Sequence, residues 1–324
     1  MSFAFVFPGQ GSQSLNMMDG FADLPVVKQT FDEASAVLGD DLWAMLKAES
    51  ADAINATVNT QPLMLAAGVA TWRAWQAVGG ALPVAVAGHS LGEYSALVAA
   101  GALSFADAVK LVRLRAQAMQ EAVPAGEGAM AAILNLSDDD IRAACAEAAQ
   151  GEVVEAVNFN SPGQVVIAGA KAAVERAMEL CKAKGAKRAL PLPVSVPSHC
   201  ALMKPAAERL AAALAEVEIK APSIPVLHNA DVASYSDPAQ IRDALVRQLY
   251  SPVRWTETVQ KLAADGVLQL AECGPGKVLA GLAKRIDGNV KGLALTDAAG
   301  RAGHQRHFTL QTHQLSPRNA PPPE

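Results

Sequence analysis

Cysteine is scarce in this chain of 324 residues, which has only four: Cys145, Cys181, Cys200 and Cys273. They lie far apart and form no C-x-x-C pair, so the sequence points to neither a zinc site nor a disulfide framework. We therefore expect no bound metal. Such low use of cysteine in a long chain is typical of a protein in a reducing cytoplasm.

The chain also lacks an excess of positive charge and a long hydrophobic run. Its 27 Lys and Arg residues are outnumbered by 32 Asp and Glu residues, for a net charge of −5, whereas a nucleic-acid-binding protein needs basic residues to neutralise phosphates. No uncharged apolar run is long enough to span a membrane, and the first residues lack the basic region and cleavage site of a signal peptide. We expect a cytoplasmic protein that binds neither nucleic acid nor membranes.

Half of the residues (51%) are hydrophobic, so the chain can bury a sizeable core. Short apolar runs alternate with helical segments, which predicts a parallel sheet. The predicted strands are residues 3–7, 84–87, 224–228 and 267–271. The predicted helices are residues 26–38, 61–78, 91–100, 104–123, 203–216 and 241–249.

The segment from 126 to 194 has a different order of elements. Its predicted strands are residues 130–136, 153–157, 165–168 and 189–194, with helices at 138–149 and 172–184. This β-α-β-β-α-β order is that of the split βαβ, ferredoxin-like unit. We predict an α/β protein with a core domain of residues 1–125 and 195–299, a ferredoxin-like subdomain of residues 126–194, and a disordered polar tail of residues 300–324.

A serine stands between two glycines at the turn from the strand at 84–87 to the next helix. The stretch Gly88-His89-Ser90-Leu91-Gly92 has the G-x-S-x-G pattern of a nucleophile elbow. Such a turn pushes the Ser90 hydroxyl out of the fold and aims the Leu91 N–H, with the start of the helix, at a point where an anion can sit. The alternative is a Gly-Ser turn that merely joins two elements.

A serine hydroxyl is a weak nucleophile until a base takes its proton. Outside the tail, the histidines are His89, His199 and His228. The His89 ring would point away from the serine, and His228 ends an apolar run typical of a core position. We favour His199, which lies in the loop after the inserted subdomain. No sequence signal marks an acidic third member, so a carbonyl or an amide is an alternative partner for the base.

One arginine lies on the apolar face of the helix predicted at 104–123. At about 100° per residue, Arg115 falls with the apolar side chains, while Arg113 falls with the polar ones. Arginine cannot shed its charge, so a buried Arg115 needs a carboxylate. The residues alone leave open whether that carboxylate belongs to the protein or to a substrate.

Four segments together carry a family resemblance. They are Phe7-Pro8-Gly9-Gln10-Gly11-Ser12-Gln13, Gly88-His89-Ser90-Leu91-Gly92-Glu93, Asn158-Phe159-Asn160-Ser161-Pro162-Gly163-Gln164 and Pro197-Ser198-His199. In order and spacing they resemble the malonyl-CoA:acyl carrier protein transacylases of bacterial type II fatty acid synthesis. The resemblance runs from the N-terminus to about residue 299, and it implies a hydrolase-like α/β domain with a ferredoxin-like insert.

The resemblance implies a role for individual residues by position. Ser90 matches the nucleophile, His199 the base, and Arg115 the arginine that pairs with the malonyl carboxylate. The backbone N–H groups of Gln10 and Leu91 match the donors of the oxyanion hole. Gln248 matches the residue whose carbonyl orients the histidine, and two further residues lie in matching motifs as substrate contacts: Asn160 and Gln61.

The resemblance implies that this protein catalyses the reaction of the family. Malonyl-CoA acylates the serine, and the phosphopantetheine thiol of acyl carrier protein then takes the malonyl group. We expect a monomer without a bound cofactor. The carrier is acidic, so we also expect a basic docking patch, for which two clusters are candidates: Lys182, Lys184, Lys187 and Arg188, or Lys284 and Arg285. Alternative functions are a polyketide-pathway acyltransferase, a serine thioesterase or hydrolase, and a catalytically silent carrier-binding module.

Overall fold

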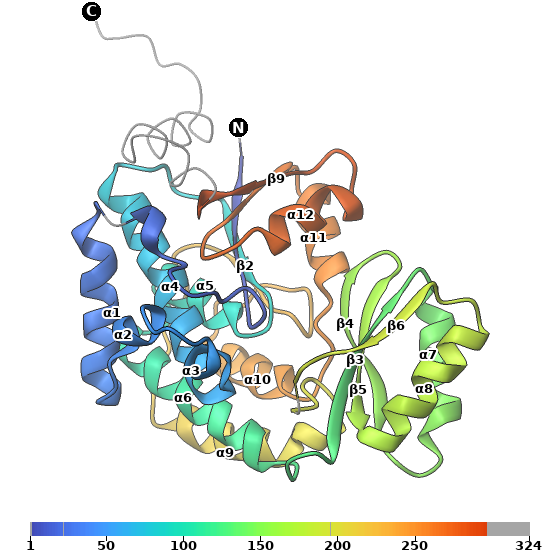
Figure 1. The fold of residues 1–324 in the computed structure, drawn as a ribbon. Helices are drawn as coiled ribbons and strands as arrows, with labels where there is room; N and C mark the ends of the chain where they lie inside the picture. The colour runs from blue at the N-terminus through green and yellow to red at the C-terminus, as the bar shows by residue number, and fades with distance from the viewer. Residues whose placement is uncertain (1, 22, 195, 297–324) are drawn as a thin grey trace, which may run out of the picture. The chain divides into compact units, whose positions relative to one another are not determined.

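The computed structural model describes residues 2–21, 23–194 and 196–296 (Figure 1). The tail expected at 300–324 lies outside the described residues. The chain divides into two compact units. The first comprises Met1–Lys110, Pro222–Val226 and Leu262–Glu324, and the second Leu111–Ala221 and Leu227–Lys261. The second unit is thus larger than the predicted subdomain, whose limits at 126 and 194 stay a prediction.

A five-stranded sheet has the order β7-β2-β1-β8-β9, and its strands other than β7 lie wholly in the first unit. The strands are β1 (Ala4–Phe7), β2 (Ala85–Gly88), β7 (Val226–Leu227), β8 (Gln269–Glu272) and β9 (Lys291–Ala294). β1 pairs in parallel with β2 and β8, and β8 with β9. All four residues of β1 and of β2 are buried, which explains why they read as unbroken apolar runs. The predicted parallel sheet is confirmed.

Helices of the first unit lie between these strands in the sequence. They are α1 (Pro25–Leu38), α2 (Leu42–Leu46), α3 (Asp52–Asn55), α4 (Thr57–Ala77), α5 (Gly92–Ala99) and α12 (Val278–Ile286). The short helices α2 and α3 were not predicted, because four or five residues are too few to show a helical period. None of the described helices is long and apolar enough to cross a membrane.

The second unit contains a four-stranded antiparallel sheet in the order β4-β5-β3-β6. Its elements follow one another as β3 (Gly128–Leu134), α7 (Asp138–Ala149), β4 (Val154–Ser161), β5 (Gln164–Ala170), α8 (Lys171–Ala183) and β6 (Arg188–Pro191). This is the predicted split βαβ order. β4 extends to Ser161 instead of ending at Val157, because polar and buried residues alternate through its second half and a tight turn with Gly163 at φ +72° leads into β5.

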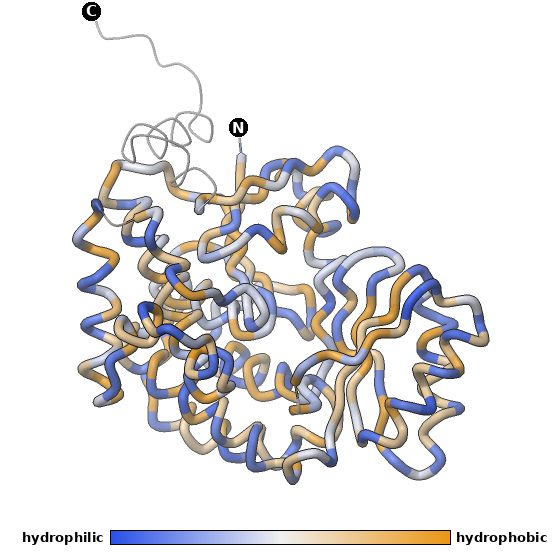
Figure 2. The backbone as a smooth tube through the Cα atoms, viewed as in Figure 1, coloured by the Kyte–Doolittle hydropathy of each residue, from blue (hydrophilic) through white to orange (hydrophobic). Residues whose placement is uncertain are grey.

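The apolar sides of α7 and α8 share one core cluster with the sheet. Its members include Ala131, Ile133, Ile141, Cys145, Val165, Ile167, Val174 and Cys181. Both helices also carry many hydrophilic residues, as Figure 2 shows, so each is amphipathic as its period predicts. The remaining helices are α9 (Lys204–Ala215), α10 (Pro238–Gln248) and α11 (Trp255–Ala264), of which α11 was not predicted. The helix α6 (Phe105–Glu121) begins in the first unit and ends in the second.

Candidate active site

Ser90 occupies a strained position at the turn between β2 and α5. Its φ of +52° lies in the left-handed region that side chains other than glycine rarely adopt. Three backbone hydrogen bonds hold the turn: the His89 N–H donates to the Phe7 carbonyl (2.9 Å), the Gly92 N–H to the His89 carbonyl (2.9 Å), and the Glu93 N–H to the Ser90 carbonyl (3.0 Å). Strain maintained in this way is typical of a functional residue.

The two flanking glycines are required by close backbone approach. A Cβ added to Gly88 would lie 1.9 Å from the Gly92 carbonyl carbon, and one added to Gly92 would lie 2.0 Å from the Phe7 carbonyl oxygen. No side chain fits at such distances. The G-x-S-x-G pattern is therefore a steric consequence of packing this turn against the end of β1.

The loop that follows β1 lies against the same turn. A Cβ added to Gly9 would be 2.5 Å from the His89 carbonyl oxygen and 3.7 Å from the Leu91 nitrogen. Leu91 stands at the N-terminus of α5, where backbone N–H groups favour negative charge. Gln10 follows Gly9 directly, so the loop carrying it borders the turn, while Gln61 is buried in α4.

His199 is held twice by the end of α10. Its backbone N–H donates to the Leu249 carbonyl (3.0 Å), and its ring Nδ1 lies 2.8 Å from the Gln248 carbonyl oxygen. A carbonyl can only accept a hydrogen bond, so Nδ1 carries the proton of the neutral ring. The lone pair is then on Nε2, which is the arrangement that a general base needs. A partner of the His199 ring is thus a backbone carbonyl.

Arg115 is buried on α6, with 1% of its surface exposed. The position on the apolar face is as the helical period predicts. Its Nη2 donates a hydrogen bond of 3.1 Å to the side-chain Oε1 of Gln248, which is itself 1% exposed. Gln248 therefore contacts His199 through its backbone carbonyl and Arg115 through its side chain. One residue thus holds both an imidazole ring and a guanidinium group.

Two other residues considered in the sequence analysis, Asn160 and His228, differ in their burial. Asn160 is half-buried on β4, next to Phe159, whose N–H donates to the Val253 carbonyl at 3.0 Å. His228 is fully buried with its ring 5.4 Å from that of Tyr235, which suits the core position expected for it. The structure thus gathers His199, Arg115 and Gln248 in the second unit, and the Ser90 turn and the Gln10 loop in the first.

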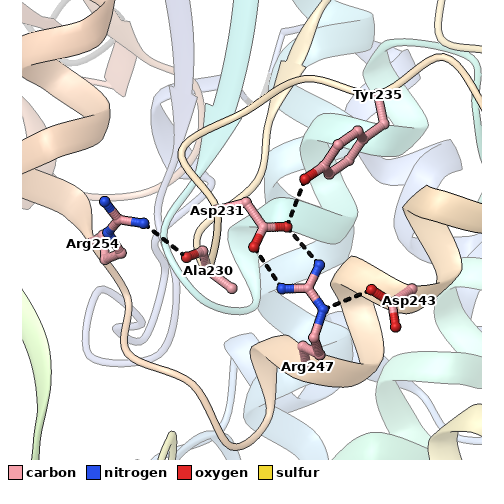
Figure 3. Close-up of polar contacts among 6 residues, drawn as sticks. All are labelled: Ala230, Asp231, Tyr235, Asp243, Arg247 and Arg254. Carbon is pink, nitrogen blue, oxygen red and sulfur yellow. Dashed lines mark hydrogen bonds and ion pairs between the residues drawn. The ribbon is translucent and has the colours of Figure 1, made fainter.

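A cluster of charged residues beside Gln248 was missed by sequence reasoning (Figure 3). Arg247 forms a bidentate ion pair with Asp231 through hydrogen bonds of 2.5 and 2.6 Å and bonds Asp243 at 2.6 Å. The Tyr235 hydroxyl also donates to Asp231 (3.0 Å). The hydrogen bonds from Arg247 hold the pKa of the Asp231 carboxyl below its ordinary value. The spacing of Asp243 and Arg247 on one helix is a visible signal, but nothing in the sequence links Arg247 to Asp231.

Comparison with known proteins identifies the family. The model of the acyl transferase domain family matches residues 4–301. The chain is 61% identical over 298 residues to the malonyl CoA-acyl carrier protein transacylase of Salmonella typhimurium, a match that covers 92% of this chain and 96% of the relative. The chain belongs to this transacylase family. The family resemblance drawn from the motifs is confirmed.

Solved structures of the transacylase family have the same fold. An acyl carrier protein S-malonyltransferase from Vibrio cholerae is 63% identical, with a TM-score of 0.89 over 91% of this chain and 96% of that one. A malonyl-transacylase solved in complex with a type II polyketide synthase acyl-carrier protein is 55% identical, with a TM-score of 0.92 over 97% and 100% of the two chains. The protein is thus an acyltransferase with the α/β fold predicted from its sequence.

Proposed function

We propose that this transacylase moves the malonyl group of malonyl-CoA onto the phosphopantetheine thiol of acyl carrier protein through a malonyl ester of Ser90. Membership of the family supports the reaction. The observation that carries the assignment of residues is the double role of Gln248, which accepts from the ring of His199 and from the guanidinium of Arg115. Transfer from a malonyl thioester requires a proton acceptor and a cation that binds the carboxylate. Gln248 holds a candidate for each, His199 and Arg115.

The first half-reaction acylates the serine. Nε2 of His199 takes the hydroxyl proton as the Ser90 oxygen attacks the thioester carbonyl. Backbone N–H groups of Leu91 and Gln10 stabilise the tetrahedral oxyanion, and one such donor contributes about 3–4 kcal/mol. The carbon–sulfur bond then breaks, the proton on His199 passes to the departing CoA thiolate to give the free thiol, and the malonyl ester remains.

The second half-reaction runs the same steps with a different thiol. His199 takes the proton of the phosphopantetheine thiol, and the sulfur attacks the ester carbonyl. The tetrahedral intermediate collapses as the Ser90 oxygen leaves and recovers its proton from His199. Two successive acyl transfers through one enzyme ester give a ping-pong mechanism, with CoA released before the carrier reacts.

Selection for malonyl groups rests on Arg115. Its side chain is buried, so an acyl group that ends in a carboxylate gives it an ionic partner, while an uncharged acyl group does not. The amide oxygen of Gln248 holds the guanidinium in place without supplying a charge. We propose Asn160 and Gln61 as further contacts of the substrate.

The carrier is the acyl carrier protein of fatty acid synthesis, and a polyketide carrier is the second candidate because the 55% identical transacylase was solved with one. We further propose a cytoplasmic monomer that needs no bound cofactor and does not bind nucleic acid. The four cysteines are buried free thiols, as suits a reducing compartment, and the net charge is −5.

The test is intact-protein mass spectrometry after brief incubation with malonyl-CoA or acetyl-CoA. Wild type should gain a malonyl adduct that Ser90→Ala does not form and Arg115→Ala forms weakly. Lys110→Ala, which removes an exposed cation from the same helix, should behave as wild type. Release of the adduct by carrier protein rather than by water identifies a transferase. Preferential labelling by acetyl-CoA would reject the malonyl assignment.

A further inference from the structure

Both groups that hold His199 come from the last turn of α10. The Gln248 carbonyl binds the His199 ring at 2.8 Å, and the Leu249 carbonyl binds its backbone N–H at 3.0 Å. This turn has hydrogen bonds of its own: the Leu249 N–H reaches the Val246 carbonyl at 3.3 Å and the Tyr250 N–H reaches the Arg247 carbonyl at 3.2 Å. A side-chain contact to a neighbouring segment is a further anchor for its position.

Arg247 supplies that anchor from the residue next to Gln248. Its guanidinium joins the end of α10 to Asp231 by two parallel hydrogen bonds of 2.5 and 2.6 Å. The side chains are only 31% and 20% exposed. Figure 3 shows the guanidinium of Arg247 facing the carboxylate of Asp231, and the hydroxyl of Tyr235 reaching the same carboxylate from the opposite side. A planar, two-point contact fixes direction as well as distance, which a single-point lysine contact cannot do.

The segment that carries Asp231 is itself strained. The next residue, Val232, has a φ of +55°, which is unusual for a β-branched side chain. The turn is closed by hydrogen bonds from the Val232 N–H to the His228 carbonyl (2.9 Å) and from the His228 N–H to the Ala233 carbonyl (3.0 Å). Arg254 adds a bond of 3.2 Å to the Ala230 carbonyl. Backbone strain of this kind persists where the surroundings fix one geometry.

We propose that Asp231 and Arg247 are a positioning pair for His199: the strained turn at 228–233 holds Asp231, Asp231 holds Arg247, and Arg247 sets the carbonyl of Gln248 that orients the imidazole. Both residues act on the His199 ring through Gln248. This inference rests on the proposed role of His199 as the base.

The experiment compares Arg247→Met and Asp231→Asn with wild type in three measurements. The first is the rate of malonyl-Ser90 formation. The second is labelling of Ser90 by a neutral alkyl fluorophosphonate, which requires the base but not Arg115. The third is the proton NMR resonance of the His199 Nδ1–H, assigned by its loss in His199→Gln. Arg209→Met is the control, because it breaks an exposed ion pair with Glu121 in the same unit.

We expect both rates to fall about tenfold in each variant, since small displacements of a catalytic group have effects of this size or larger. The His199 resonance should broaden or vanish, and Arg247→Lys should recover part of the rate. Arg209→Met should match wild type. A purely structural pair would instead lower the melting temperature and leave the rates and the resonance of the folded protein unchanged.

The outcomes separate the two proposals. If wild type forms no malonyl adduct, the proposed function fails. If wild type forms it and the folded variants label at the wild-type rate, the positioning pair is rejected. Should Arg247→Met not fold, Asp231→Asn decides the question, because it keeps the arginine and its bond to Asp243.

Discussion

Replacing Gln248 by Met separates the two contacts of this residue. Methionine is similar in length and unbranched, so it fills the buried site, and its backbone still offers the carbonyl that binds His199. The substitution removes Oε1, which accepts the 3.1 Å hydrogen bond from Arg115. The base should therefore keep its orientation while Arg115 loses the group that aims it.

The size of the effect follows from the type of hydrogen bond. A bond from a charged donor contributes about 1.5–3 kcal/mol, so kcat/KM for malonyl-CoA should fall about 10- to 150-fold. Labelling by a neutral fluorophosphonate, which makes no use of Arg115, should change by less than about threefold. The assay is the rate of Ser90 modification by each reagent, followed by intact-protein mass spectrometry.

Gln240→Met is the matched control, since Gln240 is an exposed residue of the same helix. An equal loss with both reagents would show that the Gln248 side chain acts on the base and would refute the division of roles. An unchanged rate with malonyl-CoA would show that the contact with Arg115 has no part in substrate selection.

Three further predictions concern stability and reactivity. Gly92→Ala should destabilise the fold by several kcal/mol in urea denaturation, because its Cβ would lie 2.0 Å from a carbonyl oxygen, whereas Gly281→Ala, whose Cβ meets no described atom within 4 Å, should stabilise it by about 0.5–1 kcal/mol. Burial raises the pKa of Cys145 and of Cys200 to about 12, so iodoacetamide at pH 8 should modify them only after unfolding. Arg247 holds the pKa of Asp231 below its ordinary value of 3.8. This carboxylate therefore stabilises the fold above about pH 4 and loses that effect as the pH falls through the lowered pKa. The difference in urea midpoint between wild type and Asp231→Asn should become smaller as the pH is lowered through this range.

The elements with a strong local pattern could be predicted from the sequence. The bounds of α7 were predicted correctly, and β3, α8 and β5 to within a few residues, because amphipathic periods and turn residues are properties of neighbouring positions. The edge strand β9 and the helix α11 were not predicted. The described α6 begins after Ser104, whose hydroxyl accepts a hydrogen bond from the Asp107 N–H at 3.1 Å, a contact between residues three apart in the sequence.

The sequence by itself determined the serine elbow and the place of Arg115. A serine between glycines at a strand-to-helix turn, and an arginine on an apolar helix face, are both readable within a few residues. Only the tertiary structure decided which partners these groups have. Gln248 is 49 residues from His199 and 133 from Arg115, and Asp231 reaches Arg247 from a separate turn. Hydrogen bonds join atoms that folding brings within about 3 Å, and no local period in the chain specifies such pairs.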